Sequence, residues 1–179
     1  MPSFINNIVT LALASLVLVS NVAGDKLIFR NRSDQVRWID FTPNTDGTNG
    51  IGDVRVEPRQ DVEFSMDGYG PEWDRGRGWR GNFRAHRDGA PREYDHIVWG
   101  EVCFHCDSQH PEFNTFDVSV VRDPNTQEGI HWMYPRGDPG AGLSGCDHFP
   151  CSTCYVNSGD NWQTKTTTSN DIYVEIRNS

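Results

Sequence analysis

Five cysteines are the residues of this chain whose type and spacing most directly indicate chemistry. They are Cys103, Cys106, Cys146, Cys151 and Cys154. Cys-x-x-Cys spacing suits either a disulfide or a zinc site, and His105, His110 and His148 lie close by in the sequence. Oxidising compartments favour the disulfide. We therefore expect two bridges, one thiol that stays buried or pairs between chains, and no metal or cofactor.

Tryptophans offer flat faces that can stack on sugar rings. Trp73 and Trp79 lie in or beside a glycine-rich segment, so we expect them to be exposed and to bind ligand. Trp38, Trp99 and Trp132 fall within predicted strands and are expected in the core.

An arginine-rich stretch runs through the same region. Its members are Arg75, Arg77, Arg80, Arg84, Arg87 and Arg92. Such a stretch can bind nucleic acid, but Asp and Glu outnumber Lys and Arg by 25 to 16, and the net charge is −9. An acidic domain repels phosphate backbones and anionic membranes. We expect these arginines to pair with carboxylates, and no nucleic-acid or membrane partner.

The chain begins with an uncharged apolar segment. Ile8 to Val22 is shorter than the roughly 20 residues that span a bilayer, and it ends in the small residues of Val22-Ala23-Gly24. We predict a signal peptide over 1–24 and a secreted, extracellular domain over 25–179, in preference to a membrane anchor. Asn31-Arg32-Ser33 is a sequon, so Asn31 is the predicted glycosylation site.

Alternation of apolar and polar residues dominates the rest of the chain. It is clearest around Val54, Val62, Phe116 and Val174, and turn-rich links separate these segments. Many short, half-exposed strands predict an all-β fold, an antiparallel β-sandwich. The run Thr164 to Ser169 suits either strand or loop.

Several segments resemble thaumatin-like proteins in the same order along the chain. Gly78 to His86 resembles their glycine-tryptophan strand, Gly100 to Val102 their glutamate strand, and Phe116 to Val121 their tyrosine-aspartate-valine-serine strand. Cys146 and Cys151 follow a Pro-Gly loop, as a cysteine pair does in the family. The resemblance is to the small, cysteine-poor, fungal-type branch. It implies a thaumatin-like sandwich that lacks the disulfide-rich second domain of larger, pathogenesis-related members.

The resemblance also implies an acidic cleft. Glu101 occupies the glutamate position and Asp117 the first aspartate position, while the next aspartate falls on Arg122, with Asp123 one place along. Glu101, Asp117 and Asp123 are therefore the candidate catalytic residues. The family arginine falls near His86 or Arg87, which makes Arg87 a candidate ligand-binding residue.

A cation in the cleft would lower carboxylate pKa values and oppose the protonated acid that glycoside hydrolysis needs. Because Arg122 lies in this segment, we rank binding above catalysis. The expected function is a secreted carbohydrate-binding protein for cell-wall β-1,3-glucan, at most a weak endo-β-1,3-glucanase. The alternative from another class is a secreted effector or defence protein that binds an extracellular protein; a metal-binding protein built on the cysteines ranks third.

Overall fold

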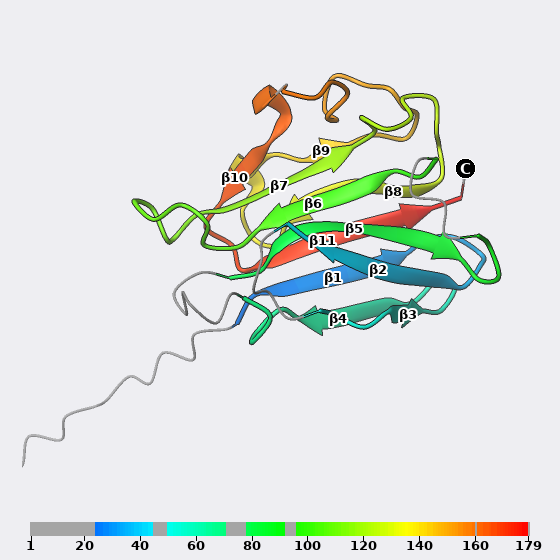
Figure 1. Cartoon of the computed structure of the whole chain (residues 1–179), viewed down its shortest axis with the longest axis horizontal. Coiled ribbons are helices and arrows are strands. Elements are labelled where there is room, and N and C mark those ends of the chain that lie inside the picture. Colours follow the sequence, from blue (N-terminus) through cyan, green and yellow to red (C-terminus); the bar gives the residue numbers. More distant parts are fainter. Residues whose placement is uncertain (1–23, 45–49, 71–77, 92–95, 160, 179) are drawn as a thin grey trace, which may run out of the picture.

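The computed structural model of the protein describes residues 24–44, 50–70, 78–91, 96–159 and 161–178. In these ranges the chain forms two β-sheets that pack face to face (Figure 1). The smaller sheet contains, in spatial order, β4 (Asp61–Ser65), β1 (Lys26–Asn31), β11 (Asp171–Arg177), β8 (Gly129–Pro135) and β9 (Ser144–Gly145). The larger contains β10 (Lys165–Thr167), β7 (Asn114–Ser119), β6 (Trp99–Cys103), β5 (Arg80–Arg87), β2 (Arg37–Pro43) and β3 (Val54–Val56). Two short 3-10 helices, η1 (Pro139–Ala141) and η2 (Asn161–Gln163), lie in the connections.

The predicted antiparallel sandwich is confirmed, with one exception. Within the described residues, neighbouring strands run antiparallel except β1 and β11, which are parallel and place Lys26 opposite Asp171. β1 lies inside its sheet between β4 and β11, and Leu27, Ile28 and Phe29 are all buried. Such a continuous apolar run is typical of a strand covered on both faces.

The alternating segments of the sequence became strands. Those around Val54, Val62, Phe116 and Val174 lie in β3, β4, β7 and β11, and the run from Thr164 to Ser169 contains β10. Among the described residues there is no helix long and apolar enough to span a bilayer. Most of the predicted leader, residues 1–23, lies outside the described residues.

Aromatic rings fill the space between the sheets, and Trp79 is one of them. Its ring meets Phe41 edge-on, with centroids 5.7 Å apart, and none of its surface is exposed. A Cβ on Gly81 would come within 2.6 Å of the Trp79 ring, so the glycine makes room for the indole. The expectation that Trp79 is an exposed, ligand-binding face is therefore wrong. Trp73 lies outside the described residues.

The tryptophans expected in the core lie instead on outer faces. Trp38 and Trp132 are half-buried, and their indole N–H groups donate to Asp88 (2.9 Å) and Asp147 (3.1 Å). Trp99 is also half-buried. The prediction that these residues lie in the core is wrong. Membership of a strand establishes that neighbouring side chains point to opposite faces of the sheet, but it does not establish which of the two faces is packed in the core.

Asn31 is also buried. Its Nδ2 donates to the carbonyl oxygens of Gln35, Val56 and Glu57, at 2.8, 3.1 and 3.0 Å. Its Oδ1 accepts from the Ser33 hydroxyl at 2.6 Å. A glycan on Nδ2 would replace these bonds and would need a path to solvent that a fully buried side chain does not have. The predicted glycosylation at Asn31 is therefore contradicted: the Asn-Arg-Ser pattern serves a buried turn.

Candidate carboxylate pocket

Polar side chains cover the outer face of the larger sheet. Strand side chains alternate between faces, so residues next to the core residues Phe83, Val102 and Phe116 point away from the smaller sheet. They include Asp40, Asn82, Arg84, His86, Glu101, Asp117 and Ser119. Hydrogen bonds join many of these groups, as buried polar atoms require. Arg84 Nη2, for example, donates to Asn82 Oδ1 at 2.9 Å.

Glu101 of β6 and Asp117 of β7 stand directly opposite each other on this face. Directly opposed residues hold their Cβ atoms about 4.5–5.5 Å apart. Both side chains line a pocket of about 260 Å³, whose walls include Arg80, Cys103 and Thr164. The structure therefore brings two of the three candidate catalytic carboxylates into one site.

The two carboxyl groups have raised pKa values. Burial, reinforced by the charge of Glu101, raises the pKa of Asp117 to about 7. A hydrogen bond from the Thr164 hydroxyl, at 3.2 Å, acts in the opposite direction and lowers this pKa in part. Burial also raises the pKa of Glu101, and a hydrogen bond with Ser119 lowers it by a smaller amount. Asp117 Oδ1 is buried without a hydrogen-bond partner among the described residues, which further favours the neutral acid. Both carboxyl groups therefore hold their protons to a higher pH than exposed carboxyl groups do, and Asp117 does so up to about pH 7.

Asp123 does not join this pair. It follows β7, and its carboxylate lies 3.0 Å from Nδ1 of His96. The hydrogen bond from His96 holds the pKa of Asp123 below its ordinary value. Asp123 is therefore an ionised surface group and is not among the residues that line the carboxylate pocket.

The arginine at the pocket is Arg80, an exposed residue at the start of β5. Arg87 lies at the other end of that strand, where its Nε donates to Glu128 at 2.9 Å. Arg122 lies over the ring of Trp99, 5.6 Å from the centroid. The expected lowering of the cleft pKa values by Arg122 is contradicted, because the pKa of Asp117 is raised.

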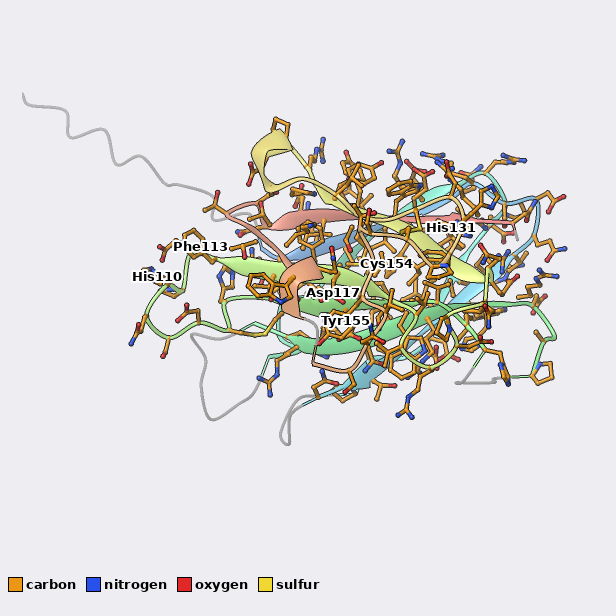
Figure 2. The ribbon with its side chains drawn as sticks, turned by 90° about the horizontal axis from the view of Figure 1, so that it is seen from above. His110, Phe113, Asp117, His131, Cys154 and Tyr155 are labelled. Carbon is orange, nitrogen blue, oxygen red and sulfur yellow. A yellow bond between two sulfur atoms is a disulfide. The ribbon has the colours of Figure 1, made fainter. Side chains whose placement is uncertain are left out.

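The segment from η2 to β10 supplies another wall of the pocket. Thr164 lies in this segment, and Figure 2 shows Asp117 beside its orange ribbon. Trp162, just before Thr164, is 86% exposed, more than any other large hydrophobic residue among those described. Trp162 is not among the tryptophans that the sequence predicted to bind ligand. Its signal was the absence of any apolar alternation around it in a polar, turn-rich stretch.

A second hollow, of about 380 Å³, lies at the far end of β5 and is lined in part by Arg87 and Glu128. The fully buried Arg37 also forms an ion pair with Glu128. Burial alone would raise the pKa of Glu128, but the guanidinium groups of Arg87 and Arg37 hold it below its ordinary value. The charges of Glu128, Arg87 and Arg37 already pair with one another and stabilise this end of β5. The carboxylate pocket is therefore the better candidate for a ligand site.

The cysteines form two bridges, Cys103–Cys106 and Cys146–Cys151. Cys154 remains a buried thiol, one of the two fates expected for the odd cysteine. The sulfur atoms of Cys146, Cys151 and Cys154 all lie within 4.8 Å of one another, and no other cluster of potential metal ligands occurs in the described ranges. Two of these three sulfurs are committed to a disulfide.

The fold and the site define a β-sandwich protein with a carboxylate pocket on the outer face of its larger sheet. No family model matches the chain. The antigenic protein SchS21 of Stachybotrys chartarum is 27% identical over 142 residues, which cover 78% of this chain and 85% of that protein.

Two solved structures align with most of the chain. The protein elicitor MoHrip2 from Magnaporthe oryzae aligns with a TM-score of 0.56 and 13% identity, over 86% of this chain and 98% of that one. The thaumatin-like xylanase inhibitor TLXI aligns with a TM-score of 0.48 and 14% identity, over 84% and 97%. The chain therefore shares its fold with the MoHrip2 elicitor.

Proposed function

We propose that this is a secreted protein that binds a neutral polysaccharide, cell-wall β-1,3-glucan, at the carboxylate pocket. The observation that carries the proposal is that Glu101 and Asp117, whose pKa is raised to about 7, stand opposite each other and line one pocket. A carboxylic acid donates a hydrogen bond and a carboxylate accepts one, so the pair matches a sugar hydroxyl, which does both. An uncharged glucan is not repelled by a net charge of −9.

Trp162 supplies the apolar half of the proposed recognition. Its exposed indole lies just before Thr164, which reaches into the pocket. An aromatic face can cover the apolar side of a pyranose ring while polar groups hold the hydroxyls. Trp162 takes the role that the sequence suggested for Trp79, which is buried.

Binding fits this pocket better than hydrolysis does. Glycosidases place two carboxyl groups on either side of the scissile bond, whereas Glu101 and Asp117 project side by side from one sheet face. Asp117 is only 7% exposed. Reducing-sugar release is therefore expected to be slight or absent.

A sedimentation assay with insoluble β-1,3-glucan, cellulose and chitin tests the proposal. We expect the parent to prefer β-1,3-glucan, and Glu101→Gln and Trp162→Ala each to weaken retention about tenfold, the loss of one good contact of about 1.4 kcal/mol. Asp123→Asn removes a carboxylate outside the pocket and serves as the matched control, with retention unchanged. If the parent is retained no better on glucan than on an inert resin, the carbohydrate proposal fails.

The second candidate function is that of a secreted effector or defence protein with an extracellular protein partner. The likeness to an antigenic protein and the fold shared with an elicitor support it. Applying the purified protein to leaf tissue and following the oxidative burst tests it, with heat-denatured protein as the control. A response that Glu101→Gln and Trp162→Ala both preserve would separate this function from glucan binding.

A further inference from the structure

Backbone hydrogen bonds hold Cys146, Cys151 and Cys154, the three-cysteine cluster, in a fixed loop beside the smaller sheet. Cys146 N–H donates to the carbonyl of His131 in β8 at 2.9 Å. Gly145 N–H donates to the carbonyl of Thr153 at 2.8 Å, and the Thr153 hydroxyl donates back to the Gly145 carbonyl at 2.6 Å. Both arms of the loop are tied together, so the three sulfurs are kept close.

The Cys154 thiol lies against one end of the bridge. Cys151 N–H donates to Cys154 Sγ at 3.4 Å, and the Cys154 thiol donates to the Cys151 carbonyl at 3.3 Å. Cys154 is 1% exposed, whereas Cys146 and Cys151, the two ends of the bridge, are both half-buried. The unpaired sulfur is therefore hydrogen-bonded to the Cys151 backbone, and it lies within 4.8 Å of both bridged sulfurs.

A bridge between Cys151 and Cys154 would have the same spacing as a bridge that the protein already contains. Cys103 and Cys106 are joined across a Cys-x-x-Cys spacing with their Cα atoms 5.7 Å apart. Cys151 and Cys154 have the same spacing. Two such pairs are present, and only one is bridged.

We propose that the three-cysteine cluster is a thiol–disulfide exchange site, in which Cys154 displaces Cys146 from Cys151 and Cys146 becomes a surface thiol that takes up a low-molecular-weight disulfide. The Cys154 thiol first loses its proton to solvent base. Its sulfur then attacks Cys151 Sγ, the Cys151–Cys154 bond forms, and the Cys146–Cys151 bond breaks with its electron pair on Cys146.

The second step conserves electrons as well. The Cys146 thiolate attacks one sulfur of the small disulfide, forms a mixed disulfide and releases the other half as a thiolate. The first step rearranges bonds within the chain and needs no outside oxidant; the second uses the small disulfide as its co-reactant. Burial raises the pKa of the Cys154 thiol, so the exchange is faster in mildly alkaline buffer.

Oxidised glutathione serves as the probe. The folded parent is incubated with it at about pH 8, near the ordinary thiol pKa, then acid-quenched, alkylated with N-ethylmaleimide, digested with pepsin and mapped by mass spectrometry. We expect a glutathione adduct on Cys146 together with a Cys151–Cys154 bridge. Cys154→Ala should lower the adduct at least tenfold, whereas a Cys103→Ala/Cys106→Ala variant, which lacks only the remote bridge, should form it as the parent does.

An adduct on Cys154 with the Cys146–Cys151 bridge intact, a Cys146–Cys154 bridge, or no adduct at all would overturn the assignment. If Cys154→Ala does not fold, Cys146→Ala decides the matter. That variant should form the Cys151–Cys154 bridge and show no free thiol. Two free thiols in a cooperatively folded Cys146→Ala protein would sink the proposal.

Discussion

Replacing Asp117 with asparagine should make the protein more stable at neutral and alkaline pH. Below about pH 4 the carboxyl group is neutral in both the folded and the unfolded chain. As the pH rises toward 7, the carboxyl group ionises in the unfolded chain but stays protonated in the folded one. This ionisation stabilises the unfolded state, so the free energy of unfolding falls until the pH reaches about 7 and is constant above it. The gap between 3.8 and about 7 corresponds to about 4 kcal/mol.

The amide introduced by Asp117→Asn would be neutral at every pH and could still accept the Thr164 hydrogen bond. Allowing about 1 kcal/mol for a poorer hydrogen bond, we expect the variant to gain about 3 kcal/mol at pH 8 and to lose up to about 1 kcal/mol at pH 4. For a domain of this size that is on the order of 10 °C in Tm. Urea unfolding from pH 4 to 8 measures it, with Glu101→Gln as a companion that should flatten the profile in part. Parallel curves for parent and Asp117→Asn would refute the reasoning.

Four further outcomes follow from packing and from the cysteines. Glu128→Ala leaves Arg37 buried without its carboxylate and should cost about 3–5 kcal/mol in denaturant unfolding; a loss below about 1 kcal/mol would contradict the network. Trp79→Ala should lower the free energy of unfolding by about 3–5 kcal/mol, and Trp162→Ala should change it by no more than about 0.5 kcal/mol; equal losses would show that the burial of the two side chains is misassigned. Protein from its own secretory pathway should carry no stoichiometric zinc by elemental analysis, and one zinc per chain with four or more free thiols would overturn that. Cys151→Ala should keep a cooperative thermal transition, because the core is large enough without this bridge; its complete loss at room temperature would contradict this.

Local pattern was enough to predict the strands and part of the site. Alternation is a short-range property, and it placed Val54, Val62, Phe116 and Val174 in strands correctly. It also put Asp117 on the face opposite Phe116. The family resemblance implied that Asp117 and Glu101 share one cleft, but their direct opposition depends on the register of β6 against β7, which only the structure shows.

Contacts between distant segments decided the rest. Trp79 enters the core because Gly81 leaves room for its ring, a fact of packing rather than of composition. Asp123 is turned toward His96, and Arg122 toward Trp99, by the path of the chain after β7. The pairing among five cysteines is likewise a question of which sulfurs the fold brings together.

The parallel pairing of β1 with β11 has a consequence for how the domain is made. β1, an inner strand of the smaller sheet, pairs with β4 and β11, and β11 is formed only by residues 171–177. During synthesis, every residue up to the last strand must emerge before that sheet can close, so the growing chain carries an open edge at β1 throughout. Unpaired edges recruit other strands, and a chain interrupted before Asp171 would therefore aggregate instead of folding to a smaller, working domain.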